Sequence, residues 1–161
     1  QTYALGLSKD SSGNFYATGY TAGNLGGQTK TGALDMFIVQ YNSSMSIAWV
    51  RLLGVSGANT YGNWVTVDSQ NNVYVTGNTN GNLDGQTKSG AQDMFIAKYD
   101  TSGNRIWTKL LGSSGSTADG QGVTFDSNST MYVSGSINGS IGSETHSYAP
   151  NNALMITRFV K

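Results

Sequence analysis

The chain repeats itself with a period of 58 residues, and this period restricts the possible folds more than any other feature of the sequence. Tyr16, Tyr74 and Tyr132 follow one another at that spacing, inside the related strings NFYATG, NVYVTG and TMYVSG. Several short segments of each period are rich in Val, Ile, Tyr, Phe, Trp and Thr, the residues enriched in β-strands. A long period that holds several β segments indicates an array of small sheets.

Each repeat contains four such segments. We expect the first strand over residues 3–9, 62–68 and 120–126, then the Tyr-containing strings, then DMFIVQY, DMFIAKY and ALMITRF, and finally WVRLLG and WTKLLG. Turns that start with Asp, at residues 10–14 and 100–104, predict hairpins in which Gly adopts positive φ. The repeats are predicted to span 1–59, 60–117 and 118–161, and the third stops before its fourth strand.

The third and fourth segments are apolar on both faces, which indicates sheets that are covered on both sides. Met94 and Ile96 point to one face, and Phe95 and Tyr99 to the other, whereas a sheet with one wet face alternates apolar and polar residues. We therefore predict an all-β fold of three four-stranded antiparallel sheets, stacked as blades of a β-propeller, the last without its outer strand. A flat or solenoidal stack of the same sheets is the alternative.

Three blades cannot close a ring, because closure takes roughly four to eight. A large apolar side chain left in water forgoes about 1.5–3 kcal/mol, so open blade faces favour assembly. We expect another chain to complete the ring, in a homo-oligomer that is a dimer of about six blades or something larger. The alternative is a piece of a longer polypeptide, because the chain opens on Gln1 without a leader segment, like a processed chain or a fragment.

The repeat also resembles a known family. The string GNxYxTGxT, followed by DxFIxKYDxSG and WxxxLG, is similar to the bacterial β-propeller repeat called SBBP, and residues 72–112 carry it best. The first copy departs from it at residues 41–45, and the third lacks the Asp before its third strand and the whole fourth strand. The resemblance implies a propeller in secreted or surface-anchored bacterial proteins, acting as a scaffold or interaction module.

Charge and composition argue against several classes of partner. Nine Lys and Arg balance nine Asp and Glu, so no net field attracts nucleic acid or anionic lipid. No apolar run approaches the roughly 18 residues that span a bilayer. The chain has no Cys, which removes disulfides and thiolate metal sites.

No constellation of residues predicts an enzyme, a metal site or a cofactor. His146 and Glu144 lie in one loop, but the groups that would orient an acid and base pair do not accompany them. The Asp-led turns lack the further carboxylates of a calcium loop. We therefore assign no catalytic residues.

Two further predictions concern recurring side chains. Asp35 and Asp93 precede the third strands and are expected to accept hydrogen bonds from loop N–H groups. Trp49 and Trp107 stand between apolar neighbours in the fourth strands and are expected to anchor the core. Both predictions are structural and supply no ligand site.

A binding surface fits the sequence better than an active site does. Because the strands alternate in direction, the long connections leave the sheets on one face of the ring, where function most often resides. Amides beside aromatic rings can hold sugar hydroxyls and stack on a pyranose ring, and the candidate ligand-binding residues are Asn24, Gln28, Lys30, Tyr61, Trp64, Asn82, Gln86 and Lys88. The competing interpretation is that the loop residues hold the long loop against the next blade.

We therefore expect a non-enzymatic, self-assembling β-propeller module, secreted or at the bacterial cell surface, that serves as a structural or interaction scaffold. The alternative is a multivalent lectin, in which repetition of weak glycan sites adds avidity. Neither function requires a cofactor.

Overall fold

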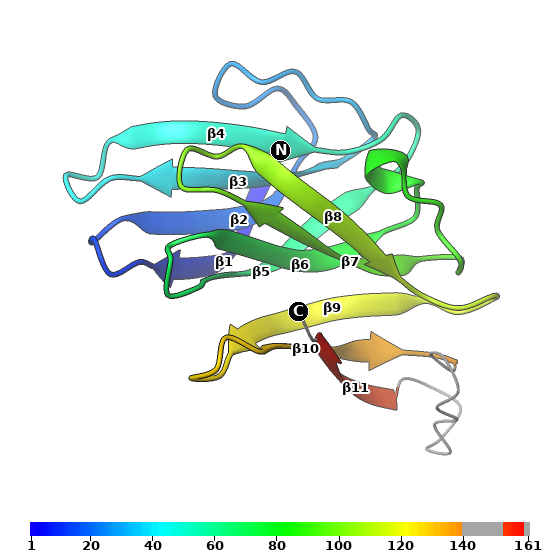
Figure 1. Cartoon of the computed structure of the whole chain (residues 1–161). Coiled ribbons are helices and arrows are strands. Elements are labelled where there is room, and N and C mark those ends of the chain that lie inside the picture. The colour runs from blue at the N-terminus through cyan, green and yellow to red at the C-terminus, as the bar shows by residue number, and fades with distance from the viewer. Residues whose placement is uncertain (140–152, 160–161) are drawn as a thin grey trace.

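The structure of the chain, a computed structural model, describes residues 1–139 and 153–159 and consists of three antiparallel β-sheets (Figure 1). The first sheet contains β1 (Thr2–Lys9), β2 (Phe15–Thr21), β3 (Asp35–Tyr41) and β4 (Ile47–Leu53). The second contains β5 (Thr60–Val67), β6 (Val73–Thr79), β7 (Asp93–Tyr99) and β8 (Arg105–Leu111). The third contains β9 (Ala118–Phe125), β10 (Met131–Ile137) and β11 (Ala153–Phe159). A single 3-10 turn, η1 (Leu83–Gly85), is the helical structure of the described residues.

The three sheets lie against one another as blades of a partial β-propeller, as the sequence predicted. Within each sheet the strands neighbour one another in chain order. The first strands of successive sheets are in contact, β1 with β5 and β5 with β9, so they form the inner edge of the stack. β4 and β8 form the outer edges of the first two blades, and the third sheet has three strands in the described residues.

The inner strands differ from the prediction at their ends. β5 and β9 begin two residues before the expected starts and end one residue before the expected ends. Each inner strand also contains a β-bulge at the same repeat position, where Leu5, Asn63 and Gln121 fall outside the regular pairing. A bulge adds a residue and increases the local twist of the strand. The period of 58 residues therefore preserves an irregularity that strand patterning alone does not predict.

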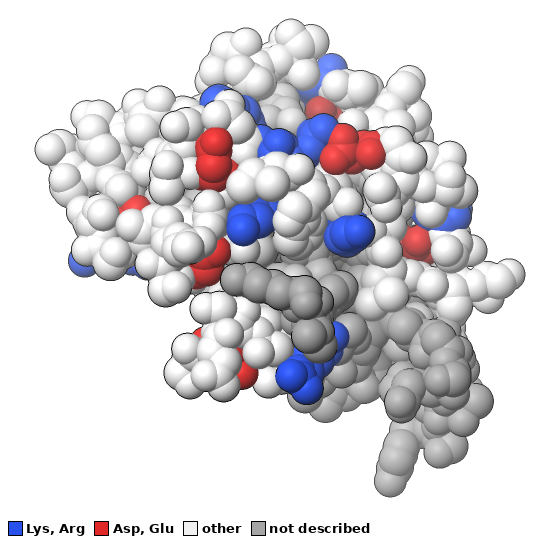
Figure 2. Space-filling view, in the orientation of Figure 1, with Lys and Arg blue, Asp and Glu red and all other residues white. Residues whose placement is uncertain are grey.

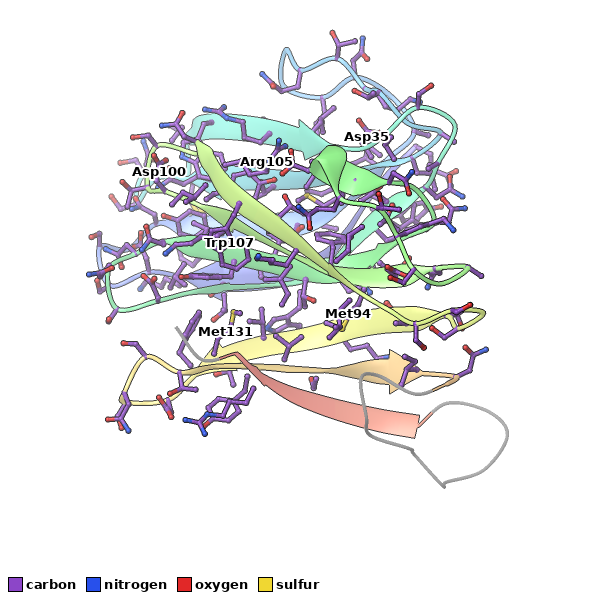
Figure 3. The ribbon with its side chains drawn as sticks, turned by 45° about the vertical axis from the view of Figure 1, so that its right-hand side comes forward. Asp35, Met94, Asp100, Arg105, Trp107 and Met131 are labelled. Atoms are coloured by element: carbon purple, nitrogen blue, oxygen red, sulfur yellow. The ribbon has the colours of Figure 1, made fainter. Side chains whose placement is uncertain are left out.

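Each blade has a forward face, which faces the next blade along the chain, and a back face, which faces the preceding blade. The forward faces carry Tyr16, Thr18, Met36 and Ile38 in the first blade, Tyr74, Thr76, Met94 and Ile96 in the second, and Tyr132 and Ser134 in the third. The back faces carry Leu7, Phe15 and Ala17 in the first blade, Val65, Val73 and Val75 in the second, and Val123, Met131 and Val133 in the third. Two apolar clusters join forward faces to back faces, and Met94 and Met131 lie in the second of them (Figure 3).

The middle blade is covered on both sides, as the apolar pattern predicted. All seven residues of β6 are buried. In β2 the forward residues Tyr16 and Thr18 are buried while Phe15 and Ala17 are half-buried, and β10 shows the opposite phase. Each end blade therefore has one covered and one open face.

The outer strands are less buried than the sequence suggested. Ile47 and Ile106, at the beginnings of β4 and β8, are exposed. Trp49 and Trp107, expected as core anchors, are half-buried and pack against the edges of the two clusters. Both lie on outer strands, which have a blade neighbour on one side and solvent at their edge.

Candidate functional site

The long connections gather at one end of the blades, and the tight turns point the other way (Figure 1). The loop after β2 pairs with the loop between β4 and β5 through Ala33 N–H and the Ala58 carbonyl, at 2.7 Å. The next blade repeats the contact between Ala91 N–H and the Ser116 carbonyl, also at 2.7 Å. The predicted loop face therefore exists, and its loops are hydrogen-bonded to one another.

Two buried carboxylates hold these loops. Asp35 accepts hydrogen bonds from the N–H groups of Thr31 (2.8 Å) and Gly32 (2.7 Å). Asp93 makes the same pair of contacts with the loop of the second blade. The structural role predicted for these residues agrees with this geometry, because both carboxylates are buried and accept hydrogen bonds from their own loops. Asp35 is labelled in Figure 3.

Most of the polar loop residues proposed as ligands are engaged inside the loop. The Asn24 side-chain oxygen accepts a hydrogen bond from Lys30 N–H at 3.0 Å, and the Lys30 ammonium donates to the Ala33 carbonyl at 3.2 Å. Asn82 and Lys88 repeat the first contact at 3.1 Å. The competing interpretation expected the loop residues to hold the loop against the next blade, whereas the hydrogen bonds described for these four residues lie within each loop.

The two glutamines differ from these residues. Gln28 is half-buried and Gln86 is exposed, and no side-chain hydrogen bond of either is among the described contacts. The second loop also places Leu83, fully buried, in the cluster with the preceding blade. A ligand role for the glutamines stays a prediction.

Tyr61 and Trp64 belong to β5 and not to the loop before it, because the strand begins at Thr60. Tyr61 meets Tyr20 of the first blade edge-on, with ring centroids 4.9 Å apart, and Tyr20 meets Tyr3 at 5.1 Å. The three rings form a row across the inner edge of the first two blades.

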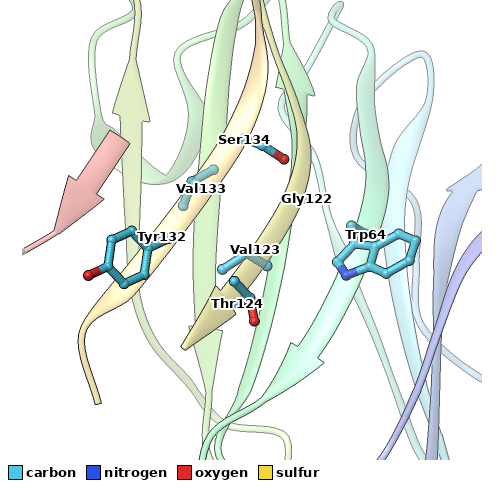
Figure 4. Close-up of a pocket in the computed structure, with 7 residues that line it drawn as sticks. All are labelled: Trp64, Gly122, Val123, Thr124, Tyr132, Val133 and Ser134. Atoms are coloured by element: carbon cyan, nitrogen blue, oxygen red, sulfur yellow. The ribbon is translucent and has the colours of Figure 1, made fainter. Parts of the chain in front are cut away.

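Trp64 lies elsewhere on β5, beside the third blade. The residue is 44% exposed and forms one wall of a groove of about 350 Å³. The groove runs over β9 and β10, and Gly122, Tyr132 and Ser134 also line it (Figure 4). This groove therefore lies on the open side of the last blade.

The joint between the second and third blades has a polar inner rim that sequence reasoning missed. The side-chain amides of Asn63 and Asn78 both donate to one oxygen of Asp119, each at 2.7 Å. Asn78 and Asp119 occupy the repeat positions of Tyr20 and Tyr61. The signal in the sequence was this paired replacement of two aromatic residues by two polar ones.

Side chains on the outer strand of the first blade form hydrogen bonds with a turn of the second blade. The Trp49 indole N–H donates to the Thr101 carbonyl at 3.2 Å, and the Arg51 Nε donates to the Gly103 carbonyl at 2.8 Å. The Arg51 guanidinium also donates to the Ser102 carbonyl at 3.1 Å. These contacts give Trp49 a role in joining blades.

A recurring carboxylate cluster fastens the tight turns. Asp10 accepts hydrogen bonds from Ser12 N–H (2.9 Å), from the backbone and side chain of Asn14 (both 2.8 Å) and from the Tyr16 hydroxyl (3.0 Å). Burial raises the pKa of the Asp10 carboxyl, but these hydrogen bonds outweigh it and hold the pKa below its ordinary value. Burial and the nearby Asp10 raise the pKa of Tyr16. A carboxylate with this many donors from its own turn is suited to fastening the turn.

Charged side chains of both signs are interspersed on the molecular surface (Figure 2). Among residues 1–139 and 153–159, no three His, Cys, Asp or Glu side chains are grouped as a metal site requires. Nor does that part of the chain hold a helix with the length and apolarity to cross a bilayer. Glu144 and His146 lie outside the described residues.

Comparisons with known proteins agree with this architecture. Residues 48–84 and 106–142 match the SBBP family model, described as a beta-propeller repeat. Each match begins in an outer strand and covers the inner strand of the next blade and the strand beside it. The chain is also 29% identical, over 119 residues, to an uncharacterized WD repeat-containing protein of Acanthamoeba polyphaga mimivirus. That match covers 63% of this chain, which spans 8% of the length of the relative.

Proposed function

Because the chain carries repeats of the SBBP β-propeller family, we propose that it is a non-enzymatic structural module that assembles through its blade faces into a closed scaffold. The observation that carries the proposal is the opposite burial of the two end blades. The back face of the first blade is open, with Leu7 64% exposed, and the forward side of the third is open at the groove. Faces of these two kinds join the blades inside the chain.

The use of the polar groups also supports a scaffold. Asn24, Lys30, Asn82 and Lys88 bond within their own loops, and Asp35 is fully committed to two loop N–H groups. A catalytic site needs an acid, base or nucleophile poised toward a substrate. Here the polar side chains form hydrogen bonds that fix the loops, which suits a rigid framework.

Light scattering across a wide range of protein concentrations tests the proposal. We expect a particle with at least twice the 17.0 kDa of one chain, because association removes the exposed apolar surface from water. A mass of 17.0 kDa at every concentration would contradict self-assembly.

Carbohydrate binding is the second candidate, favoured by one observation. Gln28 and Gln86 occupy equivalent loop positions, and no described contact engages their amides, which leaves two similar donors and acceptors for sugar hydroxyls. We expect any glycan-array signal to be lost in Gln28→Ala/Gln86→Ala and retained in the control Thr29→Ala/Thr87→Ala, which alters exposed neighbours in the same loops. A signal that survives the glutamine changes would argue against these sites.

We propose a cell-surface or secreted location for the module, in line with the resemblance of the repeat to those of secreted and surface-anchored bacterial proteins. The environment outside the cell oxidises thiols, and a chain without Cys has no thiol that could form an unwanted disulfide there. Protease treatment of intact cells that express the natural gene tests the location, and complete protection of the protein would contradict it.

A further inference from the structure

Both joints inside the chain use the same contact, in which a glycine of an inner strand lies against a threonine on the second strand of the preceding blade. We call the position of this threonine the seat. A β-carbon on Gly62 would overlap the Thr18 hydroxyl of the preceding blade, and a β-carbon on Gly120 would overlap the Thr76 hydroxyl. Each of these hydroxyls donates to a carbonyl oxygen of its own blade, at 2.7 and 2.8 Å. The oxygen is therefore fixed, and the seat accepts only a residue without a side chain.

The third blade presents the same seat with one change. Ser134 stands at the repeat position of Thr18 and Thr76. Those two threonines are fully buried, whereas Ser134 is half-buried and lines the groove with Gly122 (Figure 4). This seat has lost one methyl group and has no described residue on it.

The first blade carries the matching change on the other side of the joint. Ala4 stands at the repeat position of Gly62 and Gly120, and its pairing with Gly19 corresponds to the pairing of Gly62 with Gly77. Ala4 is exposed at the open back face. The first blade has therefore gained one methyl group at the position where a preceding blade would meet it.

The two changes compensate each other. Threonine against alanine would overpack the seat, and serine against glycine would leave a gap, whereas threonine with glycine and serine with alanine fill the same volume. Without a γ-methyl, the Ser134 hydroxyl has a second staggered position into which it can turn. The seat of the third blade and the strand of the first are thus matched to each other.

We propose that the back face of the first blade of one copy docks onto the forward face of the third blade of a second copy, with Ala4 seated on Ser134. Leu7 would then occupy the place that Val65 and Val123 hold in the internal joints and would cover Tyr132. The same contact made twice by two copies closes a six-bladed ring with every face covered. This inference rests on the proposed self-assembly and specifies its contact.

One substitution and its rescue test the contact in the full-length chain. We expect Ser134→Thr to weaken self-association by about tenfold or more, because it overpacks the seat against Ala4, and Ala4→Gly/Ser134→Thr to restore it. Ser134→Thr installs the residue that the other two blades already have, so thermal melts should show an unchanged fold. The control Ser114→Thr adds the same methyl group to an exposed loop and should leave association unchanged. Sedimentation equilibrium measures the association constant of the unaltered chain and of the three variants.

A disulfide provides a second measurement. The chain has no Cys, so in Ala4→Cys/Ser134→Cys any intermolecular disulfide joins the two positions named or two equal ones, which peptide mapping separates. A 4-to-134 crosslink between copies supports the contact. Assembly with unaltered association of Ser134→Thr and no such crosslink would overturn the contact and leave the scaffold proposal standing. A monomer at every concentration would overturn both.

Discussion

The second strand of the repeat occurs once in each blade, and its three copies differ in burial. β6 in the middle blade is buried at every residue, β2 mainly on its forward face, and β10 only on its back face. The sequences of the three strands are closely related, and the apolar residues stand at the same positions. The comparison shows that neighbouring blades decide the burial of a blade, while the repeat itself supplies two faces suited to burial.

The two internal joints teach a second lesson. Their apolar centres are built from matching positions, Tyr16 with Val65 in one and Tyr74 with Val123 in the other. Their inner rims differ, because the aromatic row of the first joint is replaced by the amide and carboxylate contacts of Asp119 in the second. The centre of a joint thus supplies stability, and its rim can distinguish one joint from another.

The largest expected effect is at the centre of the middle blade. Phe95 is fully buried and lies in the cluster between the first and second blades, so Phe95→Ala should lower the free energy of unfolding by about 3–5 kcal/mol. Urea denaturation followed by circular dichroism measures it. A loss below about 1 kcal/mol would mean that the middle blade is not covered on this face.

Equivalent positions in two blades test the comparison directly. Val65 is 1% exposed and Leu7, its counterpart, is 64% exposed. At a concentration where the chain is monomeric, Val65→Ala should cost about 2 kcal/mol, and Leu7→Ala should stay within about 0.5 kcal/mol. Equal losses at the two positions would show that both back faces are covered in the monomer.

The hydrogen bonds between Arg51 and the turn of the second blade should contribute less to stability. Arg51→Met removes two hydrogen bonds to the turn of the second blade. It is expected to cost about 1–2 kcal/mol, because one carbonyl that it leaves belongs to the exposed Ser102 and the other to the buried Gly103. Lys109, the counterpart of Arg51 in the second blade, is exposed, and Lys109→Met is the control, with no expected effect beyond about 0.5 kcal/mol. Thermal melts of both variants decide the point.

Acid should destabilise the first blade through Asp10. Its pKa in the folded chain lies below the ordinary value, so its contribution to stability is complete above the unfolded pKa of about 4 and is lost as the pH falls through the folded pKa. Asp10→Asn should therefore flatten the fall of Tm below about pH 4. An identical fall in the variant would show that the Asp10 cluster does not contribute.

The smallest expected effect concerns Tyr99, which is 2% exposed and whose hydroxyl has no hydrogen-bond partner among the described residues. Removing an unpaired buried hydroxyl relieves a desolvation penalty. Tyr99→Phe should therefore leave stability unchanged or raise it by up to about 1 kcal/mol. A clear loss of stability would point to a bound water at this hydroxyl.

The repeat made most of the fold predictable. Spacing, strand composition and Asp-led turns identified the strands, because these signals are local and occur several times. The two-sided apolar pattern of residues such as Met94 and Phe95 predicted stacking. The early starts of β5 and β9 escaped prediction. The expected strands began at Gly62 and Gly120, whereas these glycines lie inside the strands, where the close approach of a threonine requires a residue without a side chain.

The candidate site was less predictable for a physical reason. Asn24 and Lys30 have the chemistry of ligand-binding residues, but loop geometry turns them toward each other, and a sequence does not show which way a loop folds. Trp49 looked like a core residue from its neighbours, yet an outer strand leaves its ring half-buried. The sequence contains both Ser134 and Ala4, but it does not show that their repeat positions meet between blades. The proposed contact between them could therefore be recognised only from the structure.

The position of each joint within the period has a consequence for the gene. Since every blade carries both halves of the same connection, an in-frame duplication or deletion of one whole period leaves all remaining connections intact. The number of blades in the chain can therefore change in a single genetic step. Later substitutions at the seat and at the residue that faces it can make one pair of blade faces fit each other better than the other pairs. A serine with an alanine in place of a threonine with a glycine is such a change.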